Sequence, residues 1–292
     1  MSLDDLLIRG QMRLHNPRFL ISGLALVTLL LSVAALVGCG SRNDGDSNDD
    51  ANGGGVAISA MKKLPKDAGG FTFIDLAATR ADDDIAELYD HAVGMIESEC
   101  DALGISTDDV DMVADGDTVK ILEGSFDLDQ VRQELEANGY EADRYKEIDM
   151  WEKSHADIEV FALVSESCIV VGSSIDRVTD CIDVIKGDAD SLSDDEDVSE
   201  VVGRLPTGLL VAVRTGDSGV GSEAYGWSTA KKDSSTVLMT QVILFDDEPA
   251  DDAVEGLEDV YKQGYGTDKI EVKQDGRFIT VTVELDIDDI FE

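Results

Sequence analysis

The sequence predicts an α+β protein in which two tandem α/β sandwich halves, each ferredoxin-like, carry mostly antiparallel sheets. Two observations lead to this fold class. Short apolar strands alternate with amphipathic helices along the chain, and several strands are joined by short polar turns typical of hairpins. The pattern also begins twice, since Leu64-Pro65 followed by glycines and the strand "FTFIDLA" has a counterpart in Leu205-Pro206 and "LLVAVRT". The repeat divides the body into residues 59–203 and 204–292.

The first half opens with a predicted strand at 71–76. The segment 82–103 repeats apolar residues at helical spacing, and the aspartates at its start suit the positive end of a helix dipole. A strand follows at 119–125. Asp127 is then placed to cap a helix that Gly139 ends.

Two short apolar strands are predicted at 158–164 and 168–172, separated by the turn "SES". Ser174 then begins a helix that ends at Gly187, and a shorter helix covers about 194–202. The first half therefore combines hairpins with helices, as an α+β unit requires.

The second half contains a strand at 209–215, a strand at 236–245 and a helix that Pro249 begins and Gly264 ends. Strands at 269–273 and 278–285 close the chain. Asp275-Gly276 lies between them, and this dipeptide is typical of a hairpin turn.

Residues 1–38 have the order of parts of an export signal. Three arginines precede an uncharged run from Phe19 to Val37, and Gly38 closes it. Met12 offers a second possible start that would remove Asp4 and Asp5 from the leader. The absence of a twin-arginine pair favours the general secretion route.

Leu36, Val37, Gly38 and Cys39 resemble the lipobox of bacterial lipoproteins. The resemblance implies that Cys39 receives a lipid on its thiol and becomes the first residue after cleavage. The alternative is an uncleaved anchor, because nineteen uncharged residues are long enough to span a bilayer. In both cases the body lies outside the cytoplasm, on the outer face of the cytoplasmic membrane or in the cell envelope.

Residues 39–58 are predicted to be a flexible acidic tether, since they contain glycine, asparagine and aspartate with almost nothing to bury. Asp44, Asp46 and Asn48 match the first three ligand positions of a calcium loop. Asp49 and Gly55 do not match its sixth and twelfth positions, so a solvated linker is the better interpretation.

The chain has 63 acidic against 23 basic residues and a net charge of −40. Such a surface repels phosphate backbones and excludes nucleic acid as a partner. The acidic residues are spread along the whole chain, which indicates a hydrated surface with weak, diffuse cation binding. A salt-rich habitat and solubility alone both account for this composition.

The segment 215–235 is rich in glycine and serine but contains Tyr225 and Trp227. Aromatic residues on a mobile loop would form a partner surface, because loops on a rigid scaffold often carry function. A surface hairpin whose aromatic rings fold back on the core is the favoured alternative.

No catalytic, cofactor-binding or metal-binding residue is predicted. His91 and His155 are the two histidines beyond the leader, and each falls at a position expected to be exposed. Asp115 and Asp117 in "VADGD" suit a turn between strands. No nucleophile elbow, phosphate loop or dinucleotide fingerprint is present.

Cys100, Cys168 and Cys181 remain once Cys39 is assigned to lipid. One disulfide with one buried thiol is the simplest arrangement in an oxidising compartment, with Cys168 and Cys181 as a possible pair. Three buried thiols are an equal alternative.

The body resembles a group of secreted or lipid-anchored bacterial proteins of unknown function. The shared landmarks are "LEGSFD", Trp151, "IVVGS", "SLSDDEDV" and "RLPTG", over about residues 60–215. This resemblance implies an exported α+β body and brings no activity with it.

Two functions of different class follow from these observations. The first is a non-enzymatic lipoprotein that binds an envelope protein or a solute. The second is a metal-assisted hydrolase that uses clustered carboxylates with calcium or magnesium, and only the acidic excess supports it.

Overall fold

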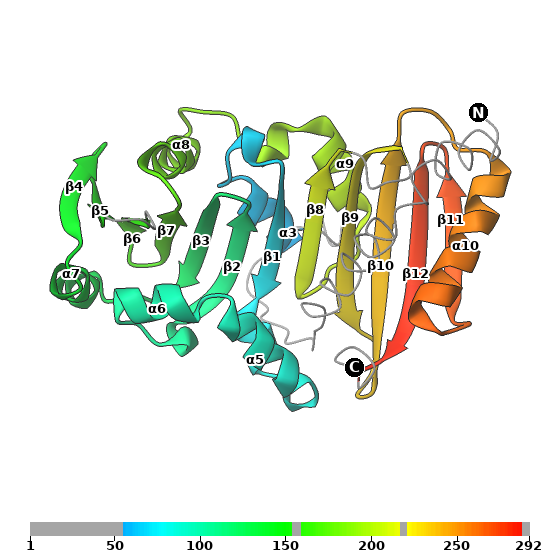
Figure 1. Ribbon diagram of the computed structural model, residues 1–292, viewed down its shortest axis with the longest axis horizontal. Coiled ribbons are helices and arrows are strands. Elements are labelled where there is room, and N and C mark those ends of the chain that lie inside the picture. Colours follow the sequence, from blue (N-terminus) through cyan, green and yellow to red (C-terminus); the bar gives the residue numbers. More distant parts are fainter. Residues whose placement is uncertain (1–54, 154–158, 217–220, 288–292) are drawn as a thin grey trace, which may run out of the picture.

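The computed structural model describes residues 55–153, 159–216 and 221–287. Their strands form one sheet of 12 strands in the order β11-β12-β10-β9-β8-β1-β2-β3-β7-β6-β5-β4 (Figure 1). All neighbouring strands are antiparallel. The α+β class and the antiparallel sheet are therefore confirmed. The division into two separate ferredoxin-like sandwiches is not confirmed, because β1 pairs with β8 and both halves share the sheet.

The strands of the first half are β1 (Gly70–Asp75), β2 (Val110–Gly116), β3 (Val119–Gly124), β4 (Glu141–Tyr145), β5 (Ile148–Glu152), β6 (Val160–Ser165) and β7 (Cys168–Gly172). Those of the second half are β8 (Leu210–Thr215), β9 (Ser222–Lys231), β10 (Thr236–Phe245), β11 (Ile270–Asp275) and β12 (Phe278–Asp286). The helices are α3 (Gly55–Met61), α4 (Leu76–Arg80), α5 (Ala86–Gly94), α6 (Glu97–Leu103), α7 (Leu128–Ala137), α8 (Ile175–Lys186), α9 (Glu196–Arg204) and α10 (Asp251–Tyr265).

The predicted caps are present where the sequence places them. The Asp127 carboxylate accepts hydrogen bonds from the backbone N–H groups of Asp129 and Gln130 at the start of α7. Ser174 accepts from the backbone N–H of Arg177 at the start of α8, and Gly187 ends that helix with φ of 79°. Local chemistry thus determines these boundaries.

Two predicted helices differ from the structure. The segment 82–103 contains a 3-10 turn, η2 (Asp83–Ile85), followed by α5 and α6, which meet at Met95 and Ile96. The last predicted helix ends at Gly266, with φ of 63°, and Gly264 lies inside it. The last helix passes Gly264 and ends at the next left-handed glycine, which is also a local signal, whereas at the α5–α6 junction the carbonyl oxygen of Met95 accepts a hydrogen bond from the Lys120 side chain.

Strands β2, β4 and β5 and helices α3 and α4 are absent from the sequence prediction, and α3 begins at Gly55, within the segment predicted to be a flexible tether. The β4 strand exposes nearly every side chain, so it shows no alternation of apolar and polar residues. The positive φ values of Lys146 and Glu147 build the turn that joins it to β5.

Helices cover both faces of the sheet. On one, here called the α9 face, α3, α8 and α9 pack against Phe71, Phe73 and Val213. On the other, the α6 face, α4 to α7 pack against residues such as Leu122 and Phe161. Figure 1 shows α7, α6 and α5 following one another along one side of the molecule, while α10 lies over the C-terminal strands.

A third apolar cluster joins the halves. Val254, Leu257 and Tyr261 of α10 pack with residues of β10 and β12, and Ile85 of η2 is buried in the same cluster at 1% exposure. A segment of the first half is therefore part of the core of the second.

Candidate functional site

Tyr225 and Trp227 lie on strand β9 rather than on a mobile loop. Their rings are stacked, with centroids 6.2 Å apart and planes at 20°. Trp227 is 8% exposed and packs with Leu210 and Ala212, while Tyr225 is half-buried at the margin of the same cluster. The alternative of a hairpin with its aromatic rings against the core is the arrangement observed, since β9 pairs with β10.

A polar strip of five residues continues across the α6 face from these rings. The register places Tyr225 opposite Arg214. A neighbouring row of opposed residues crosses β9, β8, β1, β2 and β3 and consists, in that order, of Trp227, Ala212, Thr72, Asp115 and Lys120. Residues directly opposite in antiparallel strands project to the same face. The polar strip consists of Arg214, Asp117, Asp115, Lys120 and Glu99.

Two ion-paired groups make up the polar strip. Arg214 forms an ion pair with Asp117 in the turn after β2. Lys120 pairs with Glu99 of α6, donates a hydrogen bond of 2.8 Å to the carbonyl oxygen of Met95, and lies 3.9 Å from an Asp115 carboxylate oxygen. The lysine side chain, 15% exposed, thereby ties the α5–α6 junction to the sheet.

The pKa values of the two carboxylates beside Lys120 are shifted in opposite directions. Burial raises the pKa of Asp115, and the neighbouring Glu99 adds to the rise against the opposing effects of Lys120 and Arg214. Burial alone would also raise the pKa of Glu99, but the hydrogen bond and charge of Lys120 bring that pKa below its ordinary value. Glu99 therefore holds the lysine, whereas the Asp115 carboxylate is poorly compensated.

Replacing Asp115 with asparagine is expected to stabilise the fold at neutral pH by up to about 1 kcal/mol. A raised pKa means that the ionised form is disfavoured in the folded state, so this unfavourable contribution exists above the pKa and disappears as the carboxyl becomes protonated. Denaturant unfolding of both proteins at pH 7 and near pH 3.5 tests this. A variant less stable than the parent at pH 7, or an equal gain at both pH values, would contradict it.

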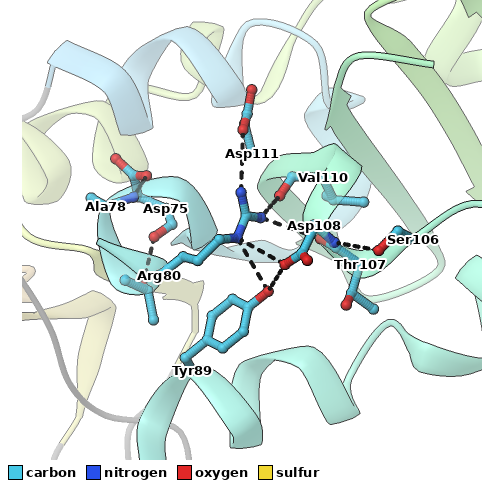
Figure 2. Close-up of polar contacts among 10 residues, drawn as sticks. Asp75, Ala78, Arg80, Tyr89, Ser106, Thr107, Asp108, Val110 and Asp111 are labelled. Carbon is cyan, nitrogen blue, oxygen red and sulfur yellow. Dashed lines mark hydrogen bonds and ion pairs between the residues drawn. The ribbon is translucent and has the colours of Figure 1, made fainter. Parts of the chain in front are cut away.

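A second polar network anchors α4 and is structural. Arg80 donates hydrogen bonds to the carbonyl oxygens of Val110 (2.7 Å) and Thr107 (3.3 Å), and its guanidinium contacts Asp108 and the Tyr89 ring (Figure 2). The Tyr89 hydroxyl in turn donates to Asp108 at 2.9 Å. Because Nε and Nη2 of Arg80 are held by these contacts, the network fixes α4 and α5 to β2.

Metal ligation finds no support in the described part of the chain: within residues 55–153, 159–216 and 221–287, no three His, Cys, Asp or Glu residues are grouped to hold an ion. Asp115 lies near the end of β2, and Asp117, with φ of 33°, lies in the expected turn that follows this strand. His91 lies on α5.

Cys100, Cys168 and Cys181 are all buried free thiols. Burial raises the pKa of Cys100 to about 12 and also raises that of Cys168. The Cys181 thiol donates to the carbonyl oxygen of Lys63 at 3.2 Å. Because the thiolate is the reactive form, these cysteines behave as core residues.

Several predicted features lie outside the described residues. These are the leader, Cys39, His155 and the calcium-like positions 44–49. None of the described helices combines the length and apolar character needed to cross a bilayer.

Fold and site together define an α+β protein with one large antiparallel sheet and an ion-paired strip beside two stacked aromatic rings. No family model matches the chain. Over 279 residues, the chain is 25% identical to the uncharacterized protein MJ0635 of Methanocaldococcus jannaschii. The matched segment covers 88% of this chain and 94% of that protein. The structure titled "Structure of crystal form IV of TP0453" is similar with a TM-score of 0.51 and 9% identity, over 80% of this chain and 97% of that one. This likeness concerns the fold alone.

Proposed function

We propose that the chain is an exported lipoprotein whose body binds a protein or solute at the cell envelope without catalysing a reaction. The observation that carries the proposal is the junction at Cys39, where an uncharged run ends in a lipobox-like sequence and a polar tether begins. Lipid on this cysteine would hold the body on the outer face of the cytoplasmic membrane or in the envelope. Two or more acyl chains, palmitate among them, anchor a protein firmly, whereas one alone does not.

The binding surface in this proposal is the half-buried Tyr225 with the adjoining polar strip. Aromatic side chains and arginine are enriched at interfaces because they combine a large contact area with polar contacts. Arg214 is one-third exposed, and Asp117 beside it is about half exposed. These groups suit recognition of a polar partner.

Replacing Cys39 with alanine is expected to abolish both lipid attachment and cleavage of the leader. Without a thiol there is no atom for the lipid, and cleavage at a lipobox follows lipid attachment, so the uncharged run Phe19 to Val37 would stay on the chain and hold the unacylated protein on the membrane. Labelled palmitate, membrane fractionation and mass spectrometry of the N-terminus measure the two effects. An unacylated, intact N-terminus on the parent protein would overturn the anchor.

The binding role is tested on the same membranes by cross-linking and affinity capture with the parent chain and a Tyr225→Ala variant. Tyr145→Ala, at the opposite end of the sheet, is the matched control. A partner captured by the parent and by the control but lost with Tyr225→Ala supports the surface. Equal capture by all three removes it.

We further propose that residues 59–203 and 204–292 are two structural repeats within the one sheet. A helix precedes the Leu-Pro pair near the start of each repeat: α3 (Gly55–Met61) lies before Leu64-Pro65 and β1, and α9, which ends at Arg204, lies before Leu205-Pro206 and β8. Each continues through three sequential antiparallel strands to a helix, α7 or α10, and β1 and β8 pair with each other. An approximate twofold axis between β1 and β8 would relate the halves, and the first half carries two additional strands.

A further inference from the structure

The sheet ends in two edge strands, β4 and β11, each paired on one side only within the described residues. An edge strand presents unpaired backbone N–H and C=O groups to any strand that can align with it. The side chains of β11 alternate between half-buried and exposed, and those of β4 are mostly exposed. The two edges therefore differ in how well they could accept another strand.

The hydrogen-bonding direction of β11 can be assigned residue by residue. The backbone N–H of Glu284 donates to the carbonyl oxygen of Lys269 at 3.0 Å, and Glu271 and Lys273 lie opposite Thr282 and Thr280 of β12. In an antiparallel ladder, hydrogen-bonded pairs recur at every second residue. The backbone groups of Lys269, Glu271, Lys273 and Asp275 thus point to β12, and those of Ile270, Val272 and Gln274 point outward.

A second copy of β11 fits this edge in one register. If Val272 lies opposite Val272 of the second copy, the hydrogen-bonded pairs are 272 with 272 and 270 with 274, which are the positions whose backbone groups point outward. In that register Glu271 lies opposite Lys273, and Lys269 lies opposite Asp275, each twice by symmetry. These are non-hydrogen-bonded pairs, in which side chains approach most closely.

The four charged residues are free to make these contacts. Their side chains are between 57% and 78% exposed, and their present partners are surface ion pairs, which contribute little. Each could exchange its partner at small cost.

Edge β4 lacks this complementarity. Its sequence, Glu141 to Tyr145, places Asp143 opposite Asp143 or Glu141 opposite Asp143 in the central self-pairings, and a register centred on Arg144 opposes two arginines. Like charges directly opposite destabilise a strand pair. Pairing of β4 with β4 of a second copy is therefore unfavourable.

We propose that the chain forms a twofold dimer in which β11 pairs antiparallel with β11 of a second copy. The dimer extends the sheet across both molecules and repeats at the edge the antiparallel pairing of β1 with β8. Because each copy carries a net charge of −40, general repulsion opposes association at low salt, and moderate salt favours it.

Native mass spectrometry of the full chain released from detergent micelles tests the dimer. Lys273→Glu places glutamates opposite each other at two symmetric positions, so it is expected to weaken dimerisation by about tenfold or more. The double variant Glu271→Lys with Lys273→Glu exchanges the charges and is expected to restore it. Lys262→Glu, which makes the same charge change on α10, is the matched control and leaves the dimer intact.

Carbodiimide cross-linking of a mixture of isotopically light and heavy chains locates the contact. A mixed light–heavy peptide joining Lys273 to Glu271 or Lys269 to Asp275 supports the β11 register. A monomeric parent chain at moderate salt, a dimer unaffected by Lys273→Glu, or failure of the charge exchange to restore it would each overturn the proposal. None of these readouts depends on the lipid anchor or on the partner of Tyr225.

Discussion

Replacing Gly124 with alanine is expected to destabilise the fold by about 2 to 4 kcal/mol. Gly124 ends β3 opposite Val110, where the register of β2 and β3 shifts. A Cβ atom there would overlap the carbonyl oxygen of Asp109, which is backbone and also accepts a 3.0 Å hydrogen bond from the Ser125 N–H. Relief of the clash requires the strands to separate at this end. Denaturant unfolding monitored by circular dichroism measures the loss.

Gly203→Ala is the matched control for this substitution. Gly203 lies in α9, and nothing stands within 4 Å of the position its Cβ would occupy. Alanine in a helix restricts the unfolded chain, so this variant should gain about 0.4 to 1 kcal/mol. Equal stability of the Gly124→Ala variant and the parent would show that β2 and β3 adjust freely at the shift.

Replacing Lys231 with methionine is expected to cost about 1 to 3 kcal/mol and to loosen the contact between the two halves. The ammonium group lies 2.6 Å from both Asp82 carboxylate oxygens and 2.7 Å from Asp84. Lys231 and Asp82 are only 11% and 14% exposed, so the substitution leaves a largely buried carboxylate without its cation. Hydrogen exchange of η2 and α5 should rise more than that of α7, which lies far from the substitution.

A double-mutant cycle with Asp82→Asn separates this ion pair from simple packing. The double variant should recover part of the loss, because no unpaired carboxylate then remains at position 82. Additive losses would exclude the coupling.

The pH dependence of the Lys231 contribution has a defined sign. Burial lowers the pKa of Lys231, but Asp82 and Asp84 outweigh it and raise the pKa above its ordinary value. The stabilisation is therefore complete below the pKa of an unfolded lysine, about 10.4, and is lost as the pH rises through the higher pKa of the folded state.

The same contacts show why sequence patterns did not reveal the candidate site. The run "ADDDIAE" has the composition of a solvated helix start, yet Ile85 is buried in the core of the other half and Asp82 pairs with a lysine 149 residues away. Likewise, Asp115 and Lys120 are five residues apart in the sequence, but Glu99 and Arg214 are distant in the sequence and are brought near them only by the fold. Alternation along β9 could have shown that Tyr225 and Trp227 share one face, although not what faces them.

The sequence by itself determined the α+β class and most helices and strands, and it predicts an export leader over residues 1–38. These features depend on periodicity, capping and turn residues that lie within a few positions of each other, as at Asp127 and Gly187. Only the tertiary structure decided that both halves share one sheet, that β4 and β5 are strands, and that an ion-paired strip adjoins Tyr225. Strand partners and buried charges depend on contacts between residues far apart in the chain, and no local pattern encodes them.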